Sequence, residues 1–193
     1  MRRLPIPRPA AWPGLLPILL LLLVSGCATP PSPGERLVET VNEHREDRGL
    51  ERVAWSPALA EVAQAHLQDL ESSDAAEGEQ CNLHSWSDEG EWTACCYRSG
   101  DEASAECMRR KPREITGGDY PHAGSEIAAW RSSGMDREEA LRIWRDSDAH
   151  YEVMVNRGVW SEVEWEAIGA ALSEEYALVW LGEEPEGDAA GAE

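Results

Sequence analysis

The chain has few positive charges and no phenylalanine. Its 193 residues hold 17 Lys and Arg against 37 Asp and Glu, a formal net charge of −20 at pH 7. A surface this acidic repels phosphate backbones, so the composition argues against nucleic-acid binding. The aromatic residues are nine Trp and four Tyr, and we expect the Trp side chains to be shared between the core and a cleft. No internal repeat is found.

Long apolar runs are also scarce. The run from Leu15 to Val24 is almost wholly apolar, and no later run approaches membrane-spanning length. Ten residues are too few to cross a bilayer core of roughly 30 Å as a helix, which needs about 20 residues. The basic residues Arg2, Arg3 and Arg8 precede the run. This arrangement is typical of a secretory signal peptide.

The end of the run indicates lipidation. The segment Leu23-Val24-Ser25-Gly26-Cys27 resembles the bacterial lipobox, in which the Cys becomes acylated and forms the new N-terminus. We therefore predict a signal peptide over residues 1–26 and a lipid anchor on Cys27, which makes the membrane a partner. An ordinary signal peptide with an incidental Cys, or an uncleaved anchor, is the alternative. The following Ala28 favours the outer membrane of a two-membrane cell, facing the periplasm.

The remainder of the chain has the size of a single domain. Residues 27–34 are predicted to form a Pro-rich extended tether. Residues 1–26 hold three Arg and no acid, so the rest of the chain has a net charge of −23. About 160 residues suffice for one domain with a proper core. We place that domain at residues 35–182 and an acidic, disordered tail at residues 183–193.

Four cysteines remain besides Cys27, and their even number in an exported chain predicts two disulfides. They are Cys81, Cys95, Cys96 and Cys107. A bond between the adjacent Cys95 and Cys96 is disfavoured by a trans peptide. Two pairings stay open: Cys81–Cys95 with Cys96–Cys107, or Cys81–Cys96 with Cys95–Cys107. A zinc site is a weaker alternative, because adjacent Cys fit poorly as two ligands of one tetrahedral ion.

Periodicity predicts helices followed by strands, an α+β order. Helical patterns cover residues 35–48, a segment that begins at Ser56-Pro57 and ends near residue 71, residues 136–144 and residues 148–155. Residues 53–55 are expected to be a short extended link, and residues 162–172 and 176–181 to be strand-like. Residues 80–118 contain the four cysteines without a sustained period, so we predict a disulfide-stapled loop region there.

Several motifs follow one another in a fixed order. They are Val41-Asn42-Glu43-His44-Arg45 with the Ala63-to-His66 helix, Leu83-His84-Ser85, Gly124-Ser125-Glu126-Ile127-Ala128, Trp144-Arg145-Asp146-Ser147-Asp148-Ala149-His150 and Ala167-Ile168-Gly169-Ala170. Together they resemble the CAP superfamily, also called the SCP domain, which includes cysteine-rich secretory proteins. The resemblance covers about residues 35–182 and departs from the family pattern at Ser125, where the family has its Glu; here Glu126 follows one residue later.

The resemblance implies an α-β-α sandwich with a central antiparallel sheet and a cleft lined by His and acidic side chains. His84 and His150 correspond to the cleft histidines. Glu126 is expected to face the cleft through a shift of the loop register, the alternative being loss of the acid. His122, just before the Gly124 motif, is a candidate for the cleft rim. His44 and His66 are interpreted as structural, because each lies within a helical pattern.

Two classes of function remain open for the cleft. The first is a non-catalytic module that binds a small ligand, a lipid or a protein in the cell envelope. The second is a hydrolase, either metal-assisted or with Ser147 as nucleophile and His150 as base. Neutral imidazoles near a carboxylate suit Zn²⁺, so His84 and His150 are the candidate metal ligands. A helix cap explains Ser147 more simply than a nucleophile does. The resemblance implies a binding module more often than an enzyme, so the binding module is favoured.

Overall fold

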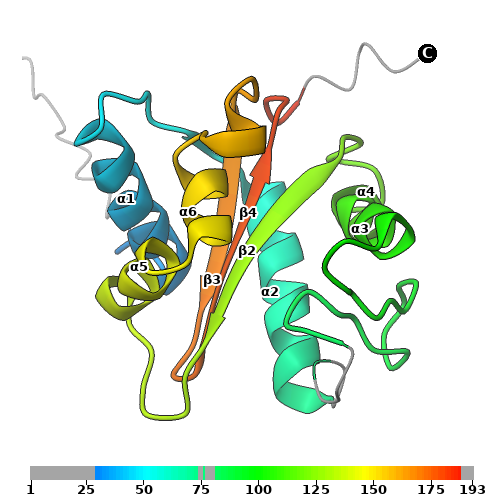
Figure 1. Cartoon of the computed structure of the whole chain (residues 1–193). Helices are drawn as coiled ribbons and strands as arrows, with labels where there is room; N and C mark the ends of the chain where they lie inside the picture. Colours follow the sequence, from blue (N-terminus) through cyan, green and yellow to red (C-terminus); the bar gives the residue numbers. More distant parts are fainter. Residues whose placement is uncertain (1–28, 74–75, 77–80, 188–193) are drawn as a thin grey trace, which may run out of the picture. The chain divides into compact units, whose positions relative to one another are not determined.

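Helices on both faces of a sheet make up the described part of the chain (Figure 1). The computed structural model describes residues 29–73, 76 and 81–187. Cys27, the predicted signal peptide and residues 188–193 of the predicted tail lie outside these ranges. The compact unit that contains the helices and the sheet begins at Pro31. None of its described helices is long and apolar enough to cross a membrane.

The helices and strands follow the predicted α+β order. The helices are α1 Pro33–Glu46, α2 Pro57–Ser72, α3 Glu102–Arg109, α4 Lys111–Ile115, α5 Arg137–Arg145, α6 Asp148–Met154 and the 3-10 helix η1 Gly158–Trp160. The strands are β1 Ala54–Trp55, β2 Gly124–Trp130, β3 Ala167–Leu172 and β4 Tyr176–Gly182.

The sheet has the strand order β1-β3-β4-β2. Its main body is antiparallel, as predicted: β4 pairs with β3 on one side and with β2 on the other. The two-residue β1 adds a parallel pair at the edge, beside β3. Strand β2 forms the opposite edge, so one of its sides is not covered by another strand. A cleft that includes Ser125 and Glu126 of β2 lies at this edge.

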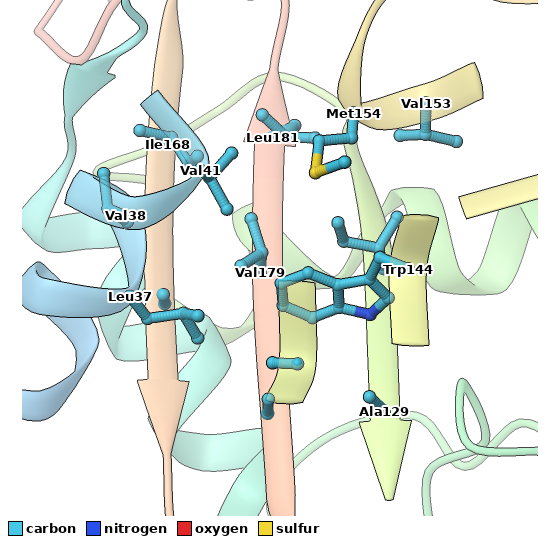
Figure 2. Packing of buried hydrophobic residues seen from close by; sticks show 14 of the residues in the cluster. Leu37, Val38, Val41, Ala129, Trp144, Val153, Met154, Ile168, Val179 and Leu181 are labelled. Carbon is cyan, nitrogen blue, oxygen red and sulfur yellow. The ribbon is translucent and has the colours of Figure 1, made fainter. Parts of the chain in front are cut away.

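Alternating side chains of β4 build two cores, one on each face of the sheet. Ala177, Val179 and Leu181 pack in the cluster that contains α1, α5 and α6. Leu178 and Trp180 pack on the other face with residues of α2 and Met108 of α3. Figure 2 shows the first cluster, in which the Trp144 ring lies beside Val179. The result is the predicted α-β-α sandwich.

Several boundaries differ from the prediction for local reasons. Helix α1 begins at Pro33, inside the predicted tether, because the Ser32 side chain accepts from the Glu35 amide and the Glu35 side chain accepts from the Ser32 amide. Helices α3 and α4 lie in the region predicted to be loop. They are only eight and five residues long, which is too short for a sustained helical pattern, and Asp101 caps α3.

Two further segments were not predicted as the structure has them. Strand β2 was identified only as a motif, because Ile127 is its one β-branched residue and the segment gives a weak strand signal. The start of the tail predicted to be disordered makes contacts with the domain. The Tyr120 hydroxyl donates to the Glu184 carbonyl at 2.7 Å, and the Ala58 amide donates to a Glu186 carboxylate oxygen at 3.3 Å.

Strand β3 is contacted closely by a helix on each face. A Cβ built on Gly169 would lie 2.1 Å from the backbone nitrogen of Ala60 in α2. A Cβ built on Gly34 of α1 would lie 2.1 Å from the backbone oxygen of Ala170. Both obstacles are backbone atoms, which cannot rotate away. Glycine at these two positions therefore lets both helical layers approach the sheet.

Gly169→Ala should destabilise the domain by about 3 kcal/mol, because the added methyl group forces α2 away from β3. Thermal or urea unfolding measures the change. Gly49→Ala is the matched control, since Gly49 has φ +74° but open space around its Cβ position; only the left-handed backbone penalty of about 1–2 kcal/mol applies there. Equal losses in the two variants would contradict the close-approach explanation.

Candidate functional site: a buried carboxylate between two histidines

Glu126 of β2 lies between two histidines from different segments. Its Oε1 is 2.6 Å from His66 Nδ1, and its Oε2 is 2.7 Å from His84 Nδ1. His66 comes from α2. His84 lies after α2, in residues 81–107, which contain the four disulfide-bonded cysteines and which we call the Cys-rich segment. The Glu126 residue is only 5% exposed and His66 is 0% exposed. Both carboxylate oxygens are therefore engaged inside the protein.

The partners of His66 determine its protonation state. Its Nδ1 faces a carboxylate, and its Nε2 lies 2.9 Å from the Ser85 carbonyl oxygen. Both partners can only accept hydrogen bonds, so both ring nitrogens must donate. His66 is therefore an imidazolium, and with Glu126 it forms a fully buried ion pair.

Electrostatics within the pair agree with this assignment. Burial alone raises the pKa of Glu126, but the His66 charge and the hydrogen bonds from both histidines lower the pKa to about 2. Burial also acts to lower the pKa of His66, yet the Glu126 carboxylate outweighs it and raises that pKa. The carboxylate and the imidazolium each keep the other charged.

The Trp86 ring supports the imidazolium from one side. The His66 and Trp86 rings stack with centroids 4.2 Å apart and an interplanar angle of 8°. Lys111 Nζ lies 5.0 Å from the centroid of the same indole. Two cations thus contact one electron-rich ring, an arrangement stabilised by the quadrupole of the indole. Trp86 belongs to the Cys-rich segment, so this stacking also holds the segment against α2.

A cleft of about 470 Å³ opens beside Glu126 along the β2 edge. His84 and His150 both line it, with ring centroids 6.3 Å apart. Burial, and then the His84 charge, lower the pKa of His150, so the His150 ring is neutral near pH 7. The other lining side chains are Asn82, Tyr97, Ser99, Ala105, Met108, Arg109, Ser125, Ala149, Glu152, Val153, Val159 and Trp160.

The disulfides hold two walls of this cleft. The structure selects Cys81–Cys96 and Cys95–Cys107, the second of the two pairings left open by the sequence. The first bond closes the loop that contains His84. The second ties this loop to α3, whose Met108 and Arg109 line the cleft. Because Cys95 and Cys96 are neighbours in the chain, the two disulfides lie next to each other and link both walls at one place.

The structure brings some predicted site residues together and leaves others apart. His84, Glu126 and His150 all line the cleft. Ser147 precedes α6 without a side-chain capping bond and is not among the lining residues. His122 does not line the cleft either; its ring packs edge-on against Tyr120 in the turn before β2, with centroids 5.6 Å apart. His122 is therefore not among the residues that line the cleft.

His66 is the residue whose part in the site was underestimated from the sequence. It was interpreted as structural, and its burial agrees with that. Its contact with Glu126, however, sets the charge and orientation of the cleft carboxylate. The available signal was its place on the apolar face of α2, because a buried polar group on such a face needs a partner.

The geometry gives only partial support to a zinc site. His84 and His150 would provide two imidazole ligands, but both oxygens of Glu126 are already bonded to histidine nitrogens. In the part of the chain that is described, no group of three or more His, Cys, Asp or Glu side chains is arranged to hold a metal ion. A tetrahedral protein zinc site takes three or four protein ligands. These residues therefore do not fit a complete site.

A larger groove lies elsewhere on the domain. It measures about 750 Å³ and runs along α1 and β1, between side chains that include Arg36, Glu39 and Arg52. No histidine or cysteine lines this groove, and the Glu39 carboxylate forms an ion pair with Arg52. The smaller cleft at β2 is the better functional candidate, because two histidines line it beside the buried Glu126 carboxylate, and burial acts on the shifted pKa values of Glu126 and His150.

Comparison with known proteins assigns the chain to a family. Residues 38–161 match the model of the cysteine-rich secretory protein family, CAP. This match covers more than half of the chain, so the chain belongs to the CAP family. The resemblance carried by the sequence motifs is thereby confirmed. No curated protein matches the chain significantly.

Solved structures show the same fold at low sequence identity. A cysteine-rich secretory protein from Staphylococcus aureus is 16% identical, with a TM-score of 0.50 over 77% of this chain. An extracellular protein containing an SCP domain, from Bacillus anthracis, is 15% identical, with a TM-score of 0.53 over 81% of this chain. The chain spans only 38% and 45% of these two proteins, respectively. The likeness therefore concerns the fold of one domain.

Glu126→Gln should reduce the free energy of unfolding by about 3–5 kcal/mol, because His66 loses its buried counter-charge. An amide oxygen can also accept from only one of the two histidine donors, and its NH₂ group would face the other. Chemical denaturation near pH 6 measures the loss. Glu152→Gln is the control: it lines the same cleft and makes the same charge change.

The pH dependence of the free energy of unfolding shows whether the Glu126–His66 contact acts as an ion pair or only as packing. The Glu126 pKa falls from an ordinary 4.5 to about 2 on folding, so its contribution is present above pH 4.5 and lost toward pH 2. The His66 pKa rises from 6.5, so its contribution is present below pH 6.5 and lost at higher pH. Glu126→Gln should flatten the acid limb of the curve, and an unchanged acid limb would refute the assignment.

Proposed function

We propose that this CAP-family chain is a non-catalytic binding module of the cell envelope, which takes up a small ligand through the β2 cleft. The observation that carries the proposal is the engagement of both Glu126 oxygens by His66 and His84. A carboxylate with a pKa of about 2 is a weak base at neutral pH. It is better suited to orienting His84 toward a ligand than to removing a proton.

The shape of the cleft supports binding of a partly apolar ligand. Met108, Val153 and Trp160 contribute apolar walls, and Val159 at the rim is 86% exposed. His84, Tyr97 and Asn82 place a few polar groups in the same space. Mostly apolar pockets with a small number of polar groups are the usual form of small-molecule sites.

Hydrolysis is the second candidate, and the observation in its favour is His150. A neutral imidazole lining a cleft can act as a general base. Its Nδ1, however, is buried without a hydrogen-bond partner among the described residues, so no carboxylate orients the ring as in a catalytic triad. Ser147 does not line the cleft. The binding function is therefore preferred.

Filling the cleft tests the binding proposal. The wild-type chain should show saturable one-site binding of an apolar anionic dye such as anilinonaphthalene sulfonate, and Ala149→Trp should abolish it. Ala149 is exposed and lines the cleft, so the larger side chain can enter the cleft without disturbing the core. Ala149→Ser is the control. Ester or peptide turnover that disappears in the His84→Ala and His150→Ala variants would instead support the hydrolase.

We also propose that Cys27 anchors the chain by acylation to a membrane, with the outer membrane and a periplasmic orientation as the expected location. The apolar run and the lipobox-like ending support this, and two acyl chains provide stable anchoring. Cys27→Ser should release the chain from membranes or block its processing. Mass spectrometry of the mature N-terminus tests this, with Thr29→Ala as control. An unmodified N-terminus at another residue would refute the anchor.

A further inference from the structure

A group of basic side chains surrounds Tyr151, outside the cleft. Arg48 Nε donates to the Tyr151 hydroxyl at 2.8 Å. The Cζ atoms of Arg48 and Arg157 lie 5.8 and 5.9 Å from the centroid of the Tyr151 ring. His44 packs edge-on against the same ring, and Arg145 is close enough to His44 to lower its pKa. We call His44, Arg48, Arg145, Tyr151 and Arg157 the Tyr151 cluster.

What distinguishes the cluster is that three arginines without carboxylate partners lie around one tyrosine and its histidine neighbour, in an acidic chain. Arg48, Arg145 and Arg157 are exposed and form no salt bridge within the described residues. Other basic side chains do pair with carboxylates: Arg52, Arg109, Lys111, Arg131, Arg137 and Arg142. In a chain of net charge −20, three arginines gathered without an acid provide a local positive site.

The Tyr151 hydroxyl is available as a donor. The hydrogen bonds from Arg48 and Arg157 lower the pKa of Tyr151, and in both bonds the phenol oxygen accepts. Its own proton is therefore not used by either arginine, and no acceptor for it is found among the described residues. Two guanidinium groups and one hydroxyl thus present donors around one point, which suits an acceptor with several oxygens.

His44 has a buried ring nitrogen that lacks a hydrogen-bond acceptor among the described residues. Burial, followed by the charges of Arg48 and Arg145, lowers its pKa to about 4, so the ring is neutral near pH 7. An Arg48 nitrogen lies 3.1 Å from His44 Nδ1. Because arginine only donates, Nδ1 must accept and Nε2 must carry the proton. That Nε2 is buried and has no partner among the described residues.

A purely structural role accounts for only part of the cluster. Arg48 donates to the His44 carbonyl at 2.9 Å and so ties the end of α1 to α6 through Tyr151. This tie requires neither Arg145 nor Arg157. The acid that acts on His44 is Asp47, and it forms no salt bridge with the three arginines. No salt bridge within the described residues therefore neutralises the three arginines.

We propose that the Tyr151 cluster binds a phosphate-type oxyanion, with Arg48, Arg157 and the Tyr151 hydroxyl as its donors. None of the cluster residues lines the β2 cleft, so this site is separate from the proposed binding site. Helix α6 connects the two, since His150 faces the cleft and the next residue, Tyr151, carries the second site. A phosphate ester on a lipid headgroup and a free phosphate share the required chemistry.

The test uses the full-length chain at low ionic strength, because exposed charges are screened by salt. The probes are inorganic phosphate and dihexanoyl phosphatidylglycerol below its micelle concentration, titrated by calorimetry or by NMR shifts. We expect saturable binding of at least one probe. Tyr151→Phe, which removes only the hydroxyl, and Arg157→Gln should each weaken it by at least about tenfold, as charge-assisted hydrogen bonds imply.

Arg113→Gln is the matched control, because Arg113 is also exposed and unpaired with a carboxylate but lies on α4. Its affinity should stay at the wild-type value, and circular dichroism should confirm that all variants fold. Binding of both probes, or of phosphate alone, supports a free oxyanion; binding of the lipid analogue alone assigns the site to a headgroup. Absence of saturable binding, or equal weakening by Arg113→Gln, would overturn the proposal.

Discussion

The buried Glu126 carboxylate is the constraint on which the site depends. It accepts hydrogen bonds from His66 of α2 and from His84 of the Cys-rich segment, and so links both to strand β2. Its negative charge keeps His66 protonated. Removing such a pair from water costs several kcal/mol of desolvation free energy, and the pair is stable only because each of its polar atoms has a hydrogen-bond partner. The arrangement of the cleft follows from this requirement, since the second oxygen of Glu126 fixes the orientation of His84.

The Cys-rich segment adds covalent and polar links to its hydrophobic packing. Its two disulfides lie within the segment and the Lys111 contact with Trp86 links it to α4, while the Trp86 stacking on His66 and the hydrogen bond from the Ser87 amide to Asp69 at 2.8 Å hold it against α2. A segment without a periodic apolar pattern could not be held by burial alone. These links position His84 and Tyr97 in the cleft, where their rings pack edge-on with centroids 5.1 Å apart.

Charge is distributed unevenly over a strongly acidic chain. Six of the fourteen described Lys and Arg residues form salt bridges with carboxylates, whereas the three arginines around Tyr151 do not. Pairs on an exposed surface contribute little to stability, so this difference bears on ligand binding more than on folding. Helix α6 is the element common to both sites: it presents His150 to the cleft and Tyr151 to the basic cluster.

The sequence by itself determined the elements with strong local signals. The Ser56-Pro57 helix start, the strand-like residues of β4 and the ordered motifs were enough to predict the α+β sandwich and the residues His84, Glu126 and His150. Helices α3 and α4 were not predicted as helices, because they are only eight and five residues long. Strand β2 was not predicted as a strand, because Ile127 is its one β-branched residue. The disulfide pairing, the charge of His66 and the absence of His122 from the cleft were decided only by tertiary structure. Each depends on distances between segments remote in sequence, which no local pattern encodes.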